Sequence, residues 1–183
     1  MMGVDEEDDK GMGNDDLVGK VQAQAPPTKS SPIGEIFYGY LMLCANSFQP
    51  AMGYLYRALA LQQSDPLLCL LCGVASLGRS TNRQVDNRNH TIMQGMALFT
   101  HYAELRGDIP EVDYNFARAY HHLNLVHLAV PRYERVLQRA SSNASKATFN
   151  MAREAAFNLA MIFTQSGSPD LARHLYRTWL AVE

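Results

Sequence analysis

Two groups of residues have types and spacings that could support metal or redox chemistry. Cys69 and Cys72 are two residues apart, the spacing of zinc-binding and disulfide-exchanging pairs, and His121, His122 and His127 are potential metal ligands close together. However, the residues around the cysteines are apolar and there is no second pair. Adjacent histidines on a helix point about 100° apart, and no carboxylate completes the set. We therefore predict core cysteines, no metal site and no cofactor.

Patterns of catalytic residues are missing from the rest of the sequence. It contains no nucleophile elbow, no phosphate-binding loop and no pair of carboxylates placed for acid–base catalysis. We therefore predict that the protein is not an enzyme and has no small-molecule substrate.

A polar stretch at residues 83–95, RQVDNRNHTIMQG, could instead contact a partner. It separates two apolar segments, and Arg83 and Arg88, together with Arg79 and His90, could bind phosphates. Its aspartate and asparagines also suit a loop that forms hydrogen bonds with itself. So few cations make a thin basic patch, and we favour contact with protein over contact with DNA.

The composition is that of a folded protein with nearly balanced charge. The chain has 183 residues, of which 47% are hydrophobic, and its formal net charge of -2 gives no general attraction to nucleic acid. No apolar run approaches the roughly 20 residues needed to cross a bilayer, and no signal peptide is present. With cysteines only in apolar surroundings, these features predict a soluble protein of a reducing compartment without membrane association.

The first 31 residues differ from the rest of the chain. They combine an acidic, glycine-rich segment with the linker VQAQAPPTKSSP, and neither has enough apolar residues to offset the entropy lost on ordering. We expect residues 1–31 to be a disordered acidic tail and linker, and residues 32–183 to be the folded domain.

From residue 32 onward the hydrophobic pattern is helical almost throughout. Three residues of capping type precede a proline, as at the start of a helix: Ser31, Asp65 and Ser168. Three glycines follow apolar stretches and are expected to end helices: Gly78, Gly107 and Gly167. The pattern predicts an all-α domain whose successive helices have about 12 to 18 residues.

Three segments share a constant spacing of small residues. In each, a small residue is followed 12 positions later by a second one, in the pairs Gly39 and Ala51, Ala117 and Ala129, and Ala160 and Ala172. Four positions further on stands a large residue: Leu55, Tyr133 and Tyr176. This pattern is typical of tetratricopeptide repeats, in which two antiparallel helices cross closely at the small residues. It predicts a right-handed tetratricopeptide-repeat solenoid of about four helix pairs, because an ordinary helical bundle does not require a constant spacing.

A fourth copy of the pattern contains an insertion. Gly73 lies 34 residues after Gly39, which is one repeat length, but its matching small residue is Gly95, 22 positions later instead of 12. Ten residues are therefore inserted between the helices of this repeat, and residues 83–95 are largely that insertion. A second insertion of nine residues lies around residues 139–150. The expected repeats are 32–65, 66–109, 110–152 and 153–183.

The repeat register also predicts which residues line the concave groove. They lie on the first helix of each repeat, at fixed positions relative to the small residue. The selected residues are Ile36, Tyr40, Leu43, Leu70, Val74, Tyr114, Arg118, His121, His122, Phe157, Met161 and Gln165. Half of this groove is apolar and half is aromatic, basic or polar, which suits a helix or an extended segment of a partner. Flanking parts of the same protein could cover the groove instead.

Three blocks of the sequence together resemble a known family. They are RQVDNRNHTIMQGMALFTHYAELRG, YNFARAYHHLNLVHLAVPRYERVL and AAFNLAMIFTQSGSPDLARHLYRTWL. Over residues 33–183 the chain resembles the C-terminal region of the tetratricopeptide subunit of general transcription factor IIIC, including the insertion that generic repeats lack. Family members are longer and have an N-terminal repeat array. The chain is therefore expected to be a fragment, a truncated gene model or a short paralogue.

The resemblance implies a nuclear, non-enzymatic scaffold that supports initiation by RNA polymerase III at transfer RNA and 5S RNA genes. The implied partners are other factor IIIC subunits and factor IIIB, and DNA is reached only through the complex. The alternative is a generic repeat adaptor of the co-chaperone type, which binds a partner peptide or helix. That alternative requires basic and asparagine side chains that clamp a terminal carboxylate, whereas Ile36 and Tyr40 stand at the corresponding places.

Overall fold

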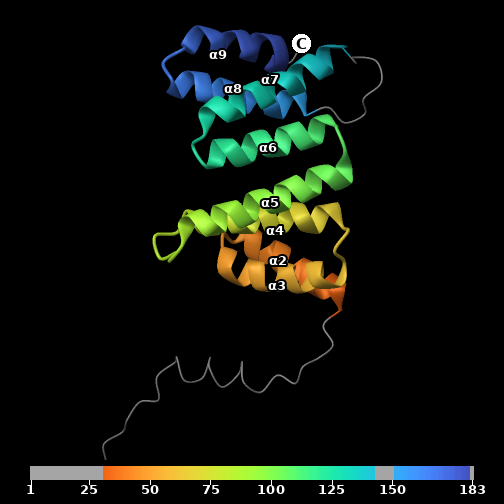
Figure 1. The fold of residues 1–183 in the computed structure, drawn as a ribbon. Coiled ribbons are helices and arrows are strands. Elements are labelled where there is room, and N and C mark those ends of the chain that lie inside the picture. Colours follow the sequence, from red (N-terminus) through yellow and green to blue (C-terminus); the bar gives the residue numbers. More distant parts are fainter. Residues whose placement is uncertain (1–30, 143–150, 182–183) are drawn as a thin grey trace, which may run out of the picture. The chain divides into compact units, whose positions relative to one another are not determined.

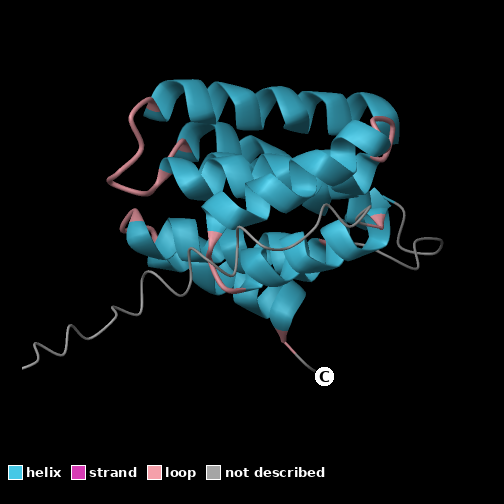
Figure 2. Ribbon diagram, turned by 90° about the horizontal axis from the view of Figure 1, so that it is seen from below, coloured by secondary structure: helices cyan, strands magenta, loops and turns pink. Residues whose placement is uncertain are grey.

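The computed structural model describes residues 31–142 and 151–181, and this part of the chain consists of helices joined by loops (Figure 2). The helices are α2 (Pro32–Cys44), α3 (Phe48–Leu61), α4 (Pro66–Ser80), α5 (Arg88–Arg106), α6 (Pro110–His122), α7 (Val126–Ser142), α8 (Ala152–Gln165) and α9 (Pro169–Leu175), which continues as the π-helix η1 (Tyr176–Leu180). They stack in sequence order (Figure 1). The prediction of an all-α solenoid of the tetratricopeptide type is confirmed. The expected disordered tail, apart from Ser31, and most of the second insertion lie outside the described residues.

The capping residues mark the helix starts correctly, but not all of them form capping hydrogen bonds. Asp65 precedes α4, and its carboxylate accepts hydrogen bonds from the N–H groups of Leu67 (2.8 Å) and Leu68 (3.3 Å). Ser168 precedes α9, but its side chain forms no capping hydrogen bond. The start of α9 is therefore favoured by Pro169, whose fixed φ suits the first turn of a helix, and not by a capping side chain.

Two of the three glycines expected to end helices do so. Gly107 and Gly167 follow α5 and α8 with a φ of 78°, a left-handed conformation that glycine adopts without strain. The prediction for Gly78 is wrong, because α4 continues to Ser80 and Gly78 is buried inside it. A Cβ atom at Gly78 would overlap the ring of Phe48 from α3, so this glycine makes room for helix packing instead of ending a helix.

The helix pairs cross at the small residues of the repeat pattern. Gly73 of α4 and Gly95 of α5 lie so close that a Cβ atom on either one would be 3.3 Å from the carbonyl oxygen of the other. The pairing of these two glycines across the insertion is therefore confirmed. A Cβ atom on Gly39 would likewise lie 2.6 Å from Leu55 Cγ in α3. The alanines at the corresponding positions are buried in one core cluster: Ala117, Ala129, Ala160 and Ala172.

The ten inserted residues do not form a single loop. α4 ends seven residues after Gly73, whereas α2, α6 and α8 end five residues after their small residue. α5 begins seven residues before Gly95, whereas α3, α7 and α9 begin three residues before theirs. The loop at residues 81–87 has seven residues, against three in the other helix pairs. Two inserted residues thus lengthen α4, four enlarge the loop, and four add about one turn to α5.

Two helix pairs contain a buried carboxylate in the same place. Asp113 on α6 is only 1% exposed and accepts hydrogen bonds from Arg132 (2.7 Å) and Arg135 (2.9 Å) on α7. Glu35 on α2 is also buried and accepts hydrogen bonds from Arg57 on α3, at 2.8 and 3.1 Å. Each acid stands four residues before the small residue of its own helix. These charged pairs hold the two helices of one repeat together.

The α6 helix joins the preceding pair mainly through side chains. α3 packs along α4 and α7 along α8, but α6 approaches α4 and α5 at only a few backbone points. The Tyr102 hydroxyl of α5 donates to Glu111 (2.8 Å) and accepts from the amide of Asn115 (2.9 Å), both on α6. Burial raises the pKa of Tyr102 to about 12, so its hydroxyl remains protonated near neutral pH. This network positions the helix that supplies the polar residues of the groove.

Candidate protein-binding groove

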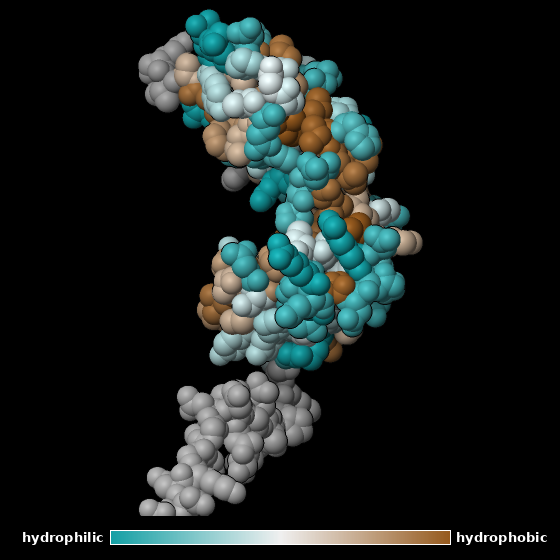
Figure 3. All heavy atoms as spheres, turned by 90° about the vertical axis from the view of Figure 1, so that its left-hand side faces the viewer, coloured by the Kyte–Doolittle hydropathy of each residue, from teal (hydrophilic) through white to brown (hydrophobic). Residues whose placement is uncertain are grey.

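Nine of the twelve predicted groove residues line four cavities on the described part of the chain. Leu43, Val74, Arg118 and His122 line a central cavity, and His121 joins the last two in a polar cavity. Ile36 and Tyr40 line a cavity between α2 and α4, and Tyr114 and Phe157 line a cavity beside α8. Leu70, Met161 and Gln165 line none of these four. The space-filling view shows the stack of helices hollowed on one side, about midway along its length (Figure 3).

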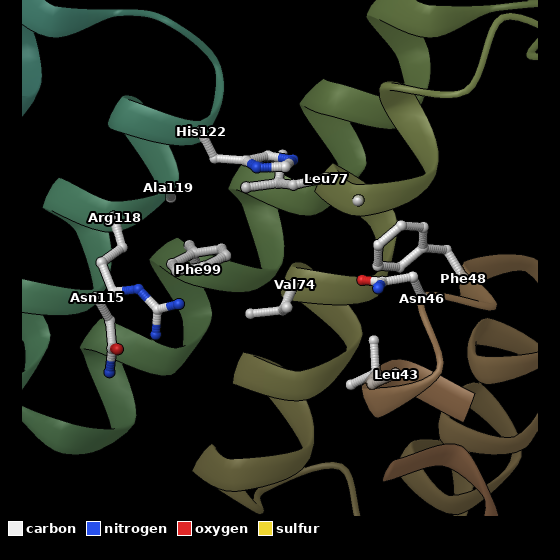
Figure 4. Close-up of a pocket in the computed structure, with 11 residues that line it drawn as sticks. Leu43, Asn46, Phe48, Val74, Leu77, Phe99, Asn115, Arg118, Ala119 and His122 are labelled. Carbon is white, nitrogen blue, oxygen red and sulfur yellow. The ribbon is translucent and has the colours of Figure 1, made fainter. Parts of the chain in front are cut away.

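The central cavity has a volume of about 290 Å³ and is lined by residues of α2, α3, α4, α5 and α6 and of the loop after α2. Its floor is apolar, made by Val74, Leu77 and Phe99. One side is closed by Leu43, Asn46 and Phe48, and the opposite side by Asn115, Arg118 and His122, which project from α6 (Figure 4). The repeat register did not select Phe48, Phe99 or Asn115, because it considered only fixed positions on the first helices.

The polar cavity, of about 210 Å³, adjoins the central cavity, since Arg118 and His122 line both. Its other lining residues are His121 of α6, Tyr133 of α7 and Asn158 of α8. No acidic residue lines either cavity. The groove therefore offers an apolar floor next to a group of hydrogen-bond donors.

Tyr133 is the residue that the sequence pattern assigned only to packing. Its side chain is 0% exposed, and its hydroxyl has no hydrogen-bond partner among the described residues. The ring packs against Tyr114 with centroids 6.1 Å apart and against His121 at 6.3 Å. Asn158 donates a hydrogen bond to the Tyr114 hydroxyl (3.3 Å).

Burial dominates the electrostatics of the polar cavity. It raises the pKa of the Tyr133 phenol, as does the neighbouring Tyr114, whereas the charge of Arg118 lowers it and so does the Asn158 amide, whose contact with the hydroxyl falls outside normal hydrogen-bond geometry. Burial, followed by repulsion from His122, lowers the pKa of His121, which favours its neutral form at pH 7. Arg118 lies over the Tyr114 ring, 5.9 Å from its centroid, and forms no ion pair with any described residue.

The cavity between α2 and α4 has a different character. Its volume is about 370 Å³, and its lining is entirely apolar or aromatic: Ile33, Ile36, Phe37, Tyr40, Leu67 and Leu71. Ile33 and Phe37 are largely exposed. No basic residue lines this cavity, and the basic and asparagine side chains that could hold a carboxylate line the other three.

The insertion exposes both of its candidate contact residues. Arg83 and Arg88 are exposed and form no hydrogen bond or ion pair with any residue that the structure describes. The loop is held by its asparagines instead, since Asn87 accepts a hydrogen bond from the N–H group of His90 (3.0 Å) and Asn82 from that of Gln84 (3.1 Å). The two guanidinium groups are therefore available for a partner.

The cysteine pair is part of the core, as predicted. Cys69 and Cys72 are fully buried, whereas Cys44 is exposed. Within the described ranges, no group of three or more His, Cys, Asp or Glu side chains is arranged to hold a metal ion. Nor does that part of the chain contain a helix with the length and apolar character needed to span a membrane.

Thiol alkylation should distinguish the three cysteines. Burial raises the pKa of Cys72 to about 12 and also raises that of Cys69, so the reactive thiolate is scarce at both sites near pH 8. We expect iodoacetamide to modify only Cys44 in the folded protein and all three cysteines in urea, as measured by intact mass. Rapid modification of Cys72 in the folded protein would contradict its place in the core.

Comparison with known proteins finds similarity to subunits of transcription factors. No protein-family model matches it. It is 34% identical over 169 residues to Transcription factor tau subunit sfc4 of Schizosaccharomyces pombe, covering 84% of this chain and 17% of the relative. It is 31% identical over 163 residues to Transcription factor tau 131 kDa subunit of Saccharomyces cerevisiae, covering 86% and 15%. It is 27% identical over 150 residues to General transcription factor 3C polypeptide 3 of Homo sapiens, covering 80% and 17%.

The chain thus spans about one sixth of the length of these relatives. The resemblance to a factor IIIC subunit, inferred from three blocks of sequence, is confirmed by the names of these relatives. The chain is a homologue of the transcription factor tau and general transcription factor 3C subunits, aligned with one segment of each.

Proposed function

We propose that this chain is a non-enzymatic scaffold of a factor IIIC complex in the nucleus, where it supports initiation by RNA polymerase III at transfer RNA and 5S RNA genes. Its partners are other factor IIIC subunits and factor IIIB, and DNA is reached through the complex. The observation that carries the proposal is the similarity to tau subunits of two yeasts along more than four fifths of the chain.

The groove supports a role in protein–protein contact. The central and polar cavities lie side by side and offer apolar and polar lining residues next to each other, an arrangement that suits a segment of another protein. The apolar cavity between α2 and α4 offers a second surface of this kind. A contact role of this kind requires no catalytic group.

Affinity purification of the full chain followed by mass spectrometry tests the proposal. We expect factor IIIC subunits to be enriched over a purification with an unrelated repeat protein of similar size. Enrichment of chaperones without factor IIIC subunits would favour the adaptor alternative and overturn the proposal.

The arginines of the insertion should contribute to assembly and little to folding. Changing both Arg83 and Arg88 to alanine should alter the free energy of unfolding by less than about 1 kcal/mol, because exposed arginines without ion pairs stabilise a fold little. Arginine at the centre of an interface is often an energetic hot spot, so recovery of factor IIIC subunits should fall severalfold. Melting temperature and co-purification measure the two effects.

Arg177→Ala, an exposed arginine on η1, is the matched control and should leave both measurements unchanged. A destabilised double variant that still recovers its partners would show that the two arginines serve folding. Loss of DNA binding alone, with steep dependence on salt, would instead assign phosphate contacts to them.

A further inference from the structure

The Tyr133 hydroxyl is unexplained by folding. It is fully buried, lines the polar cavity and has no hydrogen-bond partner among the described residues. An unpaired buried hydroxyl destabilises a fold, and phenylalanine would fill the same space without that cost. The hydroxyl therefore has a hydrogen-bonding position open to water or to a molecule that enters the cavity.

The groups around Tyr133 define the charge of that molecule. Arg118 has only donors, Asn158 presents an amide, and the Tyr133 hydroxyl can donate. Arg118 forms no ion pair with any described residue, and no acid lines this cavity or the adjoining one. A planar carboxylate matches this set, because a guanidinium group binds carboxylates with charge-assisted hydrogen bonds.

The adjoining central cavity indicates which kind of side chain should lie next to the carboxylate in the bound molecule. Arg118 and His122 border both cavities, and the floor of the central cavity is formed by Val74, Leu77 and Phe99 (Figure 4). An apolar side chain next to an acidic one would fill both. A nucleic acid would meet a single arginine in this groove, on a chain with a formal net charge of -2, and nucleic acids are usually held by several cations.

We infer that the groove binds a segment of a partner protein in which a carboxylate side chain meets Arg118, Tyr133 and Asn158 while a neighbouring apolar side chain enters the central cavity. The inference rests on the proposed function, since it requires a protein partner in the groove. It adds the chemistry of the partner segment: acidic and apolar side chains in close sequence.

Overlapping peptides that cover the other factor IIIC subunits of the same organism provide the probe, with the full chain as the binding protein. We expect the peptides that bind to contain aspartate or glutamate close to a large apolar residue. Replacing those acids by asparagine or glutamine should weaken binding by about tenfold, because the charge-assisted hydrogen bonds are lost.

Two variants separate binding from folding. Arg118→Gln should weaken the same peptides by about tenfold, and Arg177→Gln, outside the groove, should not. Tyr133→Phe removes only a hydroxyl without a partner, so the melting temperature should stay the same or rise while affinity for the acidic peptides falls severalfold. A purely structural role of Tyr133 predicts no change in affinity.

The outcomes distinguish failure of this inference from failure of the proposed function. If the chain co-purifies with factor IIIC subunits, but its binding peptides are not acidic, none bind, or Arg118→Gln binds them as the wild type does, only this inference is wrong. If no subunit co-purifies and no peptide binds, the proposed function fails as well. Two further results would overturn the assignment to a partner: competition by a DNA oligonucleotide that depends on Arg118, or binding only by a peptide of residues 1–30 of this chain.

Discussion

Replacing Asp113 by alanine should lower the free energy of unfolding by about 3 kcal/mol, measured by urea denaturation. Asp113 is 1% exposed, and Arg132 and Arg135 both donate hydrogen bonds to it from the neighbouring helix. Removing one partner of a buried ion pair lowers the free energy of unfolding by about 3–5 kcal/mol, because the other charge is left buried and unpaired. We expect the lower end, because these arginine side chains are 33% and 47% exposed and water can solvate them once the acid is gone.

Glu134→Ala is the control for Asp113→Ala, since it removes an exposed acid from α7 and should leave stability nearly unchanged. Asp113→Asn should fall between the two, because the amide oxygen still accepts one hydrogen bond without attracting the guanidinium groups as strongly. Equal stability of the Asp113→Ala variant and the wild type would show that the buried pair contributes nothing net to folding.

Gly73→Val should be nearly as damaging, with a loss of about 3 kcal/mol, at the upper end of the usual cost of overpacking. A Cβ atom at this position would lie 2.8 Å from Phe99 Cδ2 and 3.3 Å from the carbonyl oxygen of Gly95. The ring is itself buried and the carbonyl belongs to a helix backbone, so neither can move aside easily. Thermal or urea denaturation measures the effect.

Gly53→Val makes the same chemical change where there is space. Gly53 is exposed in the middle of α3, and its nearest neighbour to a new Cβ atom is the Arg57 guanidinium, at 3.7 Å. Valine has the higher helix propensity, so this variant should be as stable as the wild type or more stable by a few tenths of a kcal/mol, roughly. If both variants lose similar stability, the crossing at Gly73 is not the cause.

The crossings could be predicted because they depend on spacing within one repeat. Gly73 and Gly95 were paired from the repeat pattern despite the insertion between them, and the close approach of their backbones confirms the pairing. Gly78 could not be interpreted in this way. A glycine is needed at position 78 because the ring of Phe48 packs against it. Phe48 stands 30 residues earlier, so this contact exists only when α3 and α4 are packed together.

The charged pairs were present in the sequence as an unused signal. Glu35 and Arg57 are 22 residues apart, and so are Asp113 and Arg135. An alignment of repeats that uses only small and large apolar residues overlooks this repeated spacing of acid and arginine. Acids four residues before the first small residue, paired with arginines six residues after the second, predict this contact in other arrays of the same spacing.

The groove shows where sequence reasoning ends. Arg118 and His122 are selected by their position in the repeat and line both cavities, whereas the pattern assigns Tyr133 only to packing. Its hydroxyl becomes informative only when α6, α7 and α8 enclose it without a partner. That environment is created by residues from three helices, and no local pattern contains it.

The sparse backbone approach of α6 to α4 and α5 has a mechanical consequence. A linear array of repeats is as stiff as its junctions, and the junctions from α3 to α4 and from α7 to α8 are packed more extensively than this one. We therefore expect the array to hinge between α5 and α6, where side chains such as Phe99 and Phe116, and not close backbones, make most of the contact. The central cavity is lined by residues on both sides of that junction. A partner bound there would therefore contact α6 as well as the helices before it, and would make the array stiffer.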